Sequence, residues 1–141
     1  MTAVLVDANV LLDVMTEDAR WLAWSVEAIE RAADRRRLVI NPVIYAEVSI
    51  RYSRIEDLDA ALPRAMFDRE PIPYDAAFLA GKAFFAYRRR GGTKSLPLPD
   101  FFIGAHAAVA GYSLLTRDSA RYRTYFPKLS LIAPDGPSIS D

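Results

Sequence analysis

Short apolar runs that alternate with helical patterns are the feature that most limits how this chain can fold. Residues Ala3 to Val6 form an apolar run that stops at Asp7, as expected for a strand buried in a parallel sheet. Apolar residues at helical spacing follow directly, from Val10 to Met15. A strand that leads at once into a helix is the first half of a β-α-β unit, so this pattern predicts a parallel sheet.

The rest of the chain continues this alternation. Further strands are expected over residues 38–40, 72–74, 113–116 and 129–132. Helices are expected over residues 21–36, from Pro42 after an Asn41 cap, over 56–67 with a bend at Pro63, over 75–90, over 100–110, and briefly after Asp118. We therefore predict a single domain over residues 1–141, a three-layer α/β/α sandwich with a mostly parallel central sheet.

Four acidic residues occupy positions that point to one edge of such a sheet. Asp7 and Asp118 each follow a predicted strand, and ligands bind open parallel sheets outside these carboxyl ends. Glu47 lies on a mostly apolar helix face, and Asp100 begins another helix. If these side chains meet, two carboxylates about 4 Å apart repel by roughly 4 kcal/mol at an effective dielectric near 20. Such a group requires protonation or a bound divalent cation.

Each acid also has an ordinary explanation, which stays open at this point. Asp100 and Asp118 can be helix caps or first-turn acids, and Asp7 can be a turn residue. Glu47 can pair with Arg51 one turn later. The occurrence of all four together favours a shared site. The chain has no cysteine and 1 histidine, so the ligands would be oxygens, which suit Mg²⁺ or Mn²⁺ rather than zinc.

The net charge of zero conceals an uneven distribution. Residues 1–75 hold 9 basic and 14 acidic side chains, a net charge of −5, and residues 76–134 hold 9 basic and 2 acidic ones, a net charge of +7. Asp135 and Asp141 contribute the remaining −2. The two acids of the basic stretch are Asp100 and Asp118. A protein that binds nucleic acid through bulk charge is disfavoured, whereas a basic surface beside an acidic pocket is compatible with this pattern.

The order of these residues resembles the PIN domain family, and within it the VapC toxins, the ribonuclease halves of bacterial toxin–antitoxin pairs. The motifs that carry the resemblance are Asp7-x-Asn9, Glu47 on the helix begun by Asn41-Pro42, Asp100 through Ala107 after Pro99, and Leu114-Leu115-Thr116-x-Asp118. The resemblance spans nearly the whole chain. It is strongest from Asp100 to Pro134 and weakest from Ile55 to Lys94.

This resemblance implies a metal-dependent endoribonuclease that hydrolyses RNA phosphodiester bonds with metal-activated water. The implied roles are Mg²⁺ ligation by Asp7 and Asp100, completion of the site by Asp118 and Glu47, and positioning of the acids through hydrogen bonds by Asn9 and Thr116. Mn²⁺ is expected to substitute for Mg²⁺. The resemblance also implies a homodimer, and a small antitoxin protein that blocks the active site.

Basic residues near these acids are candidates for RNA contacts. Arg88, Arg89 and Arg90 end a predicted helix, Lys94 follows in a glycine-containing loop, and Arg117 precedes Asp118. The ordinary explanation of the arginine run is that cations stabilise the carboxyl end of a helix. An RNA-backbone role and this explanation are equally compatible with the sequence.

Two other functions remain open. A phosphatase of the haloacid dehalogenase type also places an aspartate after its first strand, but position 9 is Asn where that class has a second Asp, and no suitably placed lysine is evident. A PIN-like module that binds a partner without catalysis is the second alternative. A Ser-His-Asp hydrolase would depend on His106, which a helix turns away from Asp100, so we expect this histidine to be structural.

The sequence also indicates a cytoplasmic location. The amino-terminal segment lacks a basic region followed by a long apolar stretch, so no signal peptide is expected. The longest uncharged stretch, Phe101 to Thr116, is too short to span a bilayer comfortably.

Overall fold

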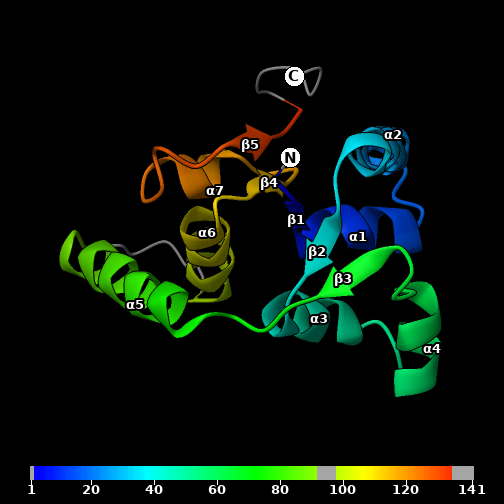
Figure 1. The fold of residues 1–141 in the computed structure, drawn as a ribbon, viewed down its shortest axis with the longest axis horizontal. Helices are drawn as coiled ribbons and strands as arrows, with labels where there is room; N and C mark the ends of the chain where they lie inside the picture. The colour runs from blue at the N-terminus through cyan, green and yellow to red at the C-terminus, as the bar shows by residue number, and fades with distance from the viewer. Residues whose placement is uncertain (1, 92–97, 135–141) are drawn as a thin grey trace.

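A single parallel sheet forms the centre of the molecule in the computed structural model, which describes residues 2–91 and 98–134 (Figure 1). The strands are β1 Val4–Val6, β2 Leu38–Ile40, β3 Phe67–Arg69, β4 Ser113–Leu115 and β5 Leu131–Ile132. Their spatial order is β3-β2-β1-β4-β5, and every pairing is parallel. The predicted fold class is therefore confirmed.

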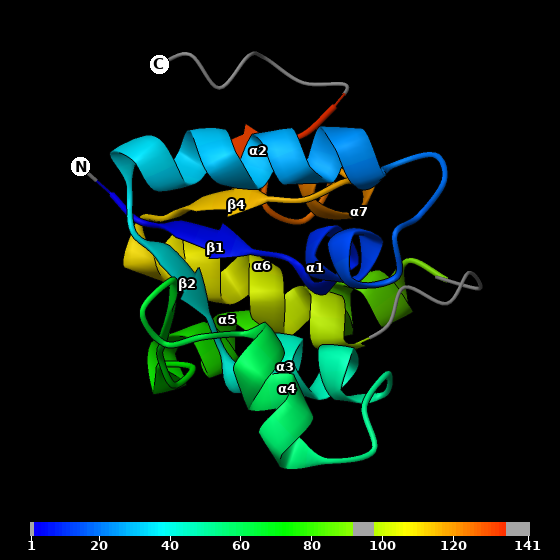
Figure 2. The same cartoon turned by 90° about the vertical axis from the view of Figure 1, so that its right-hand side faces the viewer.

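Helices cover both faces of this sheet. They are α1 Ala8–Met15, α2 Leu22–Arg35, α3 Pro42–Ser49, α4 Ile55–Ala61, α5 Tyr74–Arg89, α6 Leu98–Ala110 and α7 Ala120–Arg123. Figure 2 shows α2 along one face and α5 and α6 beneath the opposite face. No helix in the described part of the chain is long and apolar enough to cross a membrane.

The central strands follow from their apolar sequences. Every residue of β1, β2 and β4 is buried, as expected for strands with helices on both faces. In the register of β1 and β4, Val6 lies opposite Leu115, the last residue of each strand. The residues that follow these two strands therefore emerge side by side, which brings Asp7 next to Thr116.

Two predictions for the middle of the chain are wrong. The helix expected over residues 56–67 ends at Ala61, and Phe67 instead begins β3. The edge strand expected over Ile72–Tyr74 does not form, and Tyr74 begins α5 with Pro73 as its cap in place of Asp75. β3 was missed because it is an edge strand whose Asp68 is exposed and whose Arg69 is partly exposed, so it lacks the continuous apolar run of the inner strands.

Gly104 allows α6 to pack closely against the segment that follows β4. A Cβ atom built at Gly104 would lie 2.6 Å from two ring carbons of Phe126 and 3.1 Å from Tyr122 Cδ1. Both rings are buried, so neither can move aside freely. Gly81 is the natural comparison, because it lies inside α5 with nothing within 4 Å of the same position.

We predict that Gly104→Ala destabilises the protein by about 1–3 kcal/mol through overpacking. Gly81→Ala should instead stabilise it by about 0.5–1 kcal/mol, since alanine loses less backbone entropy in a helix. Urea unfolding of the two variants measures both free energies. Equal effects of the two substitutions would contradict this account of the α6 packing.

Candidate active site

The carboxyl edge of the sheet gathers the predicted acids. Asp7 follows β1 and begins α1, and Asp118 lies in the loop after β4. Glu47 comes from α3, the helix that follows β2, and Asp100 comes from the first turn of α6. Asn41 caps α3 by accepting a hydrogen bond from the Ile44 N–H at 2.9 Å, which confirms the predicted helix start.

Asp7 is the most deeply placed of the four acids. Its side chain is buried, and Oδ2 accepts hydrogen bonds from the Thr116 hydroxyl at 2.9 Å and the Tyr122 hydroxyl at 2.8 Å. Burial raises the pKa of Asp7, and the nearby charge of Asp100 adds to this. The two hydrogen bonds act in the opposite direction but do not outweigh burial.

Thr116 and Asn9 link Asp7 to the loop that carries Asp118. The Thr116 oxygen accepts hydrogen bonds from Asn9 Nδ2 at 3.3 Å and from the Asp118 N–H at 3.1 Å. Asn9 Oδ1 accepts a hydrogen bond from the Arg117 N–H at 3.2 Å. These contacts fix the loop relative to Asp7, as the supporting role predicted for both residues requires; a role in catalysis stays a prediction.

Asp100 and Asp118 are joined by Arg121, a residue that was not predicted from the sequence. Arg121 Nη1 donates to Asp100 Oδ2 at 2.9 Å, and Arg121 Nε donates to Asp118 Oδ2 at 2.6 Å. Burial raises the pKa of Asp100, and the charge of Arg121 opposes this shift without cancelling it. The Asp118 side chain is more open, with 38% of its surface exposed against 6% for Asp100.

The carboxyl group of Glu47 lies close enough to Asp7 and Asp100 to be affected by their charges. Burial, followed by the charges of Asp7 and Asp100, raises the pKa of Glu47 to about 7. Within residues 2–91 and 98–134 it forms no ion pair with Arg51, so the ordinary explanation for this acid does not hold there. The structure therefore brings Glu47 close enough to Asp7 and Asp100 for mutual repulsion.

These acids are near one another but are not gathered around one point. In the described residues, no group of three or more acidic, histidine or cysteine side chains is arranged to hold a metal ion. The donor set nevertheless fits Mg²⁺ or Mn²⁺, because all four side chains supply oxygen. Burial raises the pKa values of Asp7, Asp100 and Glu47, and the charges of neighbouring acids add to each shift, so a divalent cation at this edge would stabilise their ionised forms.

A family model for the PIN domain matches residues 4–127. The chain belongs to the PIN domain family. No curated protein matches the sequence.

Solved structures similar to this PIN domain come from toxin–antitoxin complexes. The chain is similar to VapBC2 from Rickettsia felis bound to a promoter DNA fragment, with 14% identity, a TM-score of 0.73, and coverage of 94% of this chain and 98% of that chain. It is similar to VapBC-1 from nontypeable Haemophilus influenzae, with 16% identity, a TM-score of 0.72 and the same coverage of 94% and 98%. A toxin–antitoxin complex from Klebsiella pneumoniae shows 22% identity and a TM-score of 0.68, again covering 94% and 98%. At these identities the likeness shows a shared fold.

Two residues of the candidate site in this PIN domain were missed from sequence. Tyr122 lies fully buried in the short helix α7, and its hydroxyl reaches Asp7. A buried tyrosine normally finds a partner for its hydroxyl, but nothing in the sequence shows that Tyr122 is buried. Arg121 lies three residues after Asp118, a helical spacing that could have suggested the pair.

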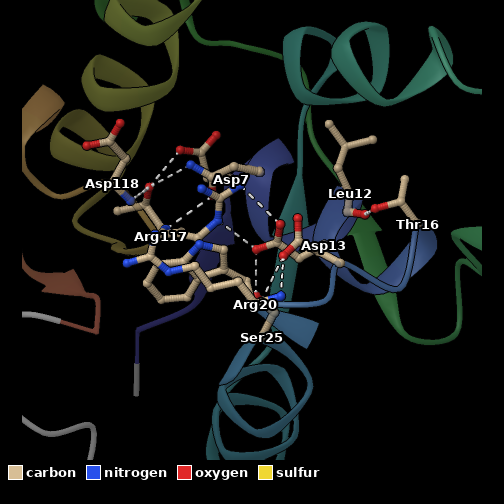
Figure 3. A network of polar contacts seen from close by, with 12 residues as sticks. Asp7, Leu12, Asp13, Thr16, Arg20, Ser25, Arg117 and Asp118 are labelled. Carbon is tan, nitrogen blue, oxygen red and sulfur yellow. Dashed lines mark hydrogen bonds and ion pairs between the residues drawn. The ribbon is translucent and has the colours of Figure 1, made fainter. Parts of the chain in front are cut away.

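Arg117 belongs to a separate network beside the site. Its Nε and Nη2 atoms donate to the two carboxylate oxygens of Asp13 at 2.8 and 3.0 Å (Figure 3). Its guanidinium also lies over the Trp21 ring. Asp13 is buried and also accepts a hydrogen bond from the Ser25 hydroxyl at 2.9 Å. A bidentate pair with a buried carboxylate is a structural role, with which any contact of Arg117 to RNA would compete.

The other basic candidates lie at or beyond the end of α5. Arg88, Arg89 and Arg90 are exposed there, and their guanidinium groups lie over the rings of Phe84, Phe85 and Tyr125 respectively. Lys94 lies outside the described residues. RNA binding by these residues stays a prediction.

His106 is structural, as predicted. It is buried, its Nδ1 lies 3.0 Å from Asn41 Nδ2, and burial lowers its pKa. The histidine therefore supports the segment that begins α3.

The raised pKa of Glu47 predicts how stability depends on pH in the absence of metal. The pKa of Glu47 is about 7 in the folded protein, whereas the ordinary pKa of a glutamate is 4.5. Between these two pH values the folded state therefore binds more protons than the unfolded state. Stability should therefore decrease as pH rises from about 5 to 8. Glu47→Gln should reduce this decrease, and Glu30→Gln, on the exposed surface of α2, should not.

Melting temperatures measured in EDTA across this pH range provide the test. If the melting temperatures of the wild type and of Glu47→Gln depend on pH in the same way, the raised pKa of Glu47 in the folded protein is contradicted.

Proposed function

We propose that this PIN domain is a metal-dependent endoribonuclease and the toxin of a VapC-type toxin–antitoxin pair. The observation that carries the proposal is the position of buried Asp7 at the carboxyl end of β1, within the electrostatic field of Asp100 and Glu47. In a parallel sheet this edge is where ligands bind. Nuclease activity is the function that accounts for such a concentration of carboxylates in this family.

In the proposed site Asp7, Asp100 and Asp118 bind Mg²⁺ or Mn²⁺, with Glu47 completing the ligand set directly or through water. The bound cation supplies a more acidic water and stabilises negative charge on the phosphate. Thr116 and Tyr122 hold the Asp7 carboxylate in one orientation through their hydroxyls.

The partners are part of the same proposal. The solved structures named above are toxin–antitoxin complexes, which supports a small antitoxin that covers the site. An RNA substrate, a homodimer and action in the cytoplasm complete the proposal. Membership of the PIN family leaves no support for the dehalogenase-type phosphatase. A non-catalytic binding module is the remaining alternative, favoured by the absence of a preassembled metal site in the described residues.

We expect Asp7→Asn and Asp100→Asn to reduce RNA cleavage by about 100-fold or more, because each removes a charge on which the metal site depends. The assay follows an end-labelled pool of cellular RNAs with Mg²⁺ or Mn²⁺, and with EDTA. Asp34→Asn is a matched control, since Asp34 is exposed and lies near the end of α2, which leads into the amino end of β2 at the opposite edge of the sheet.

Melting temperatures should show that each variant is folded. Wild-type protein that binds neither metal and leaves all RNAs intact would favour the non-catalytic module.

A further inference from the structure

Arg121 is the cation that the fold itself places at the candidate metal site. It bridges two elements, because Asp118 lies three residues before it and Asp100 lies 21 residues before it on α6. The contacts use two different nitrogens of one guanidinium, at 2.6 Å to Asp118 and 2.9 Å to Asp100. The Arg121 side chain is therefore ion-paired with two of the carboxylates that are expected to bind metal.

The charge of Arg121 offsets only part of the negative charge at this edge. It acts favourably on Asp100, Asp118 and Glu47, but it is one positive charge against four carboxylates. Asp7 is instead held by two neutral hydroxyl donors. Within the described residues Asp7 and Glu47 form no ion pair, so a further cation at this edge would reduce the repulsion that remains.

The exposure of Arg121 indicates that these ion pairs are displaceable. The Arg121 side chain is 43% exposed and that of Asp118 is 38% exposed, so solvent weakens their ion pair, whereas the Asp100 side chain is only 6% exposed. Arg117 differs in geometry, because both of its hydrogen bonds go to the two oxygens of one carboxylate, Asp13, whereas Arg121 donates one hydrogen bond to each of two acids. If Arg121 turns into solvent, the buried carboxylate of Asp100 loses its cationic partner, and a divalent cation at this edge would replace it.

We propose that Arg121 is a built-in counter-ion that competes with the divalent metal for Asp100 and Asp118, and so sets the metal concentration at which the site fills. This inference rests on the metal site of the proposed function. In the metal-free protein, Arg121 reduces repulsion among the acids and stabilises the fold. When metal binds, the guanidinium leaves both carboxylates, so Arg121 is a positioning residue of this site.

Mn²⁺ titration by calorimetry tests the competition on the full chain. Removal of two partly exposed ion pairs should make Arg121→Gln bind Mn²⁺ about 5- to 30-fold more tightly than the wild type, or about 1–2 kcal/mol. Arg121→Lys keeps the charge but lacks the planar guanidinium that reaches both acids. Its affinity for Mn²⁺ should therefore lie between those of the wild type and Arg121→Gln. Arg123→Gln removes the same charge from an exposed position of α7 and should bind like the wild type.

A second measurement separates displacement from a general effect of charge. The Nε–H resonance of Arg121, assigned by its loss in Arg121→Gln, should shift on addition of Mg²⁺ with the same half-saturation as metal binding. In EDTA, Arg121→Gln should melt below the wild type, and saturating Mn²⁺ should remove the difference.

The outcomes distinguish this inference from the proposed function. Wild-type binding of Mn²⁺ with equal or weaker binding by Arg121→Gln, or an Nε–H resonance that Mg²⁺ leaves unmoved, overturns the role of Arg121 and leaves the metal site intact. Failure of every variant to bind Mn²⁺ overturns the metal site and the counter-ion role together.

Discussion

The burial of mutually repelling carboxylates at one edge of a parallel sheet is the constraint on which the rest of this structure depends. The fold brings Asp7, Asp100 and Glu47 into a common field, and each has a raised pKa in which burial is the largest cause. A protein selected for stability alone would not concentrate acids in this way, because within the described residues Asp7 and Glu47 form no ion pair and Arg121 offsets only part of the burial of Asp100. The arrangement becomes favourable when a divalent cation is added, and this links the energetics of the fold to its proposed chemistry.

The surrounding contacts keep the acids in place against this repulsion. The pairing of β1 with β4 brings Thr116 beside Asp7, and α7 adds the Tyr122 hydroxyl to the same oxygen. The ion pair of Arg117 with Asp13 ties the loop after β4 to α1. The loop that carries Asp118 is thus fixed through Thr116 and Arg117, while Arg121, in α7, is partly exposed. Fixed support for Asp7 and a partly exposed counter-charge for Asp118 are compatible with a site that exchanges its cation.

Much of this fold was predictable because its inner strands and helix starts have strong local signals. β1, β2 and β4 are short apolar runs, and Asn41-Pro42 is a typical helix start. β3 was not predictable, since an edge strand with polar residues has no such run. The four acids could be placed at one edge from their positions after strands and on adjoining helices. The ion pair of Arg117 with Asp13 could not be found, because it joins residues 104 positions apart in the chain.

The central claim is that this carboxylate edge is completed by a divalent cation, and anomalous X-ray diffraction from Mn²⁺-soaked crystals tests it most directly. The account predicts an anomalous peak within bonding distance of Asp7 and Asp100, with the Arg121 guanidinium withdrawn from Asp100 and Asp118. A fully soaked crystal with no manganese at this edge, in which Arg121 still bridges the two aspartates, would contradict it.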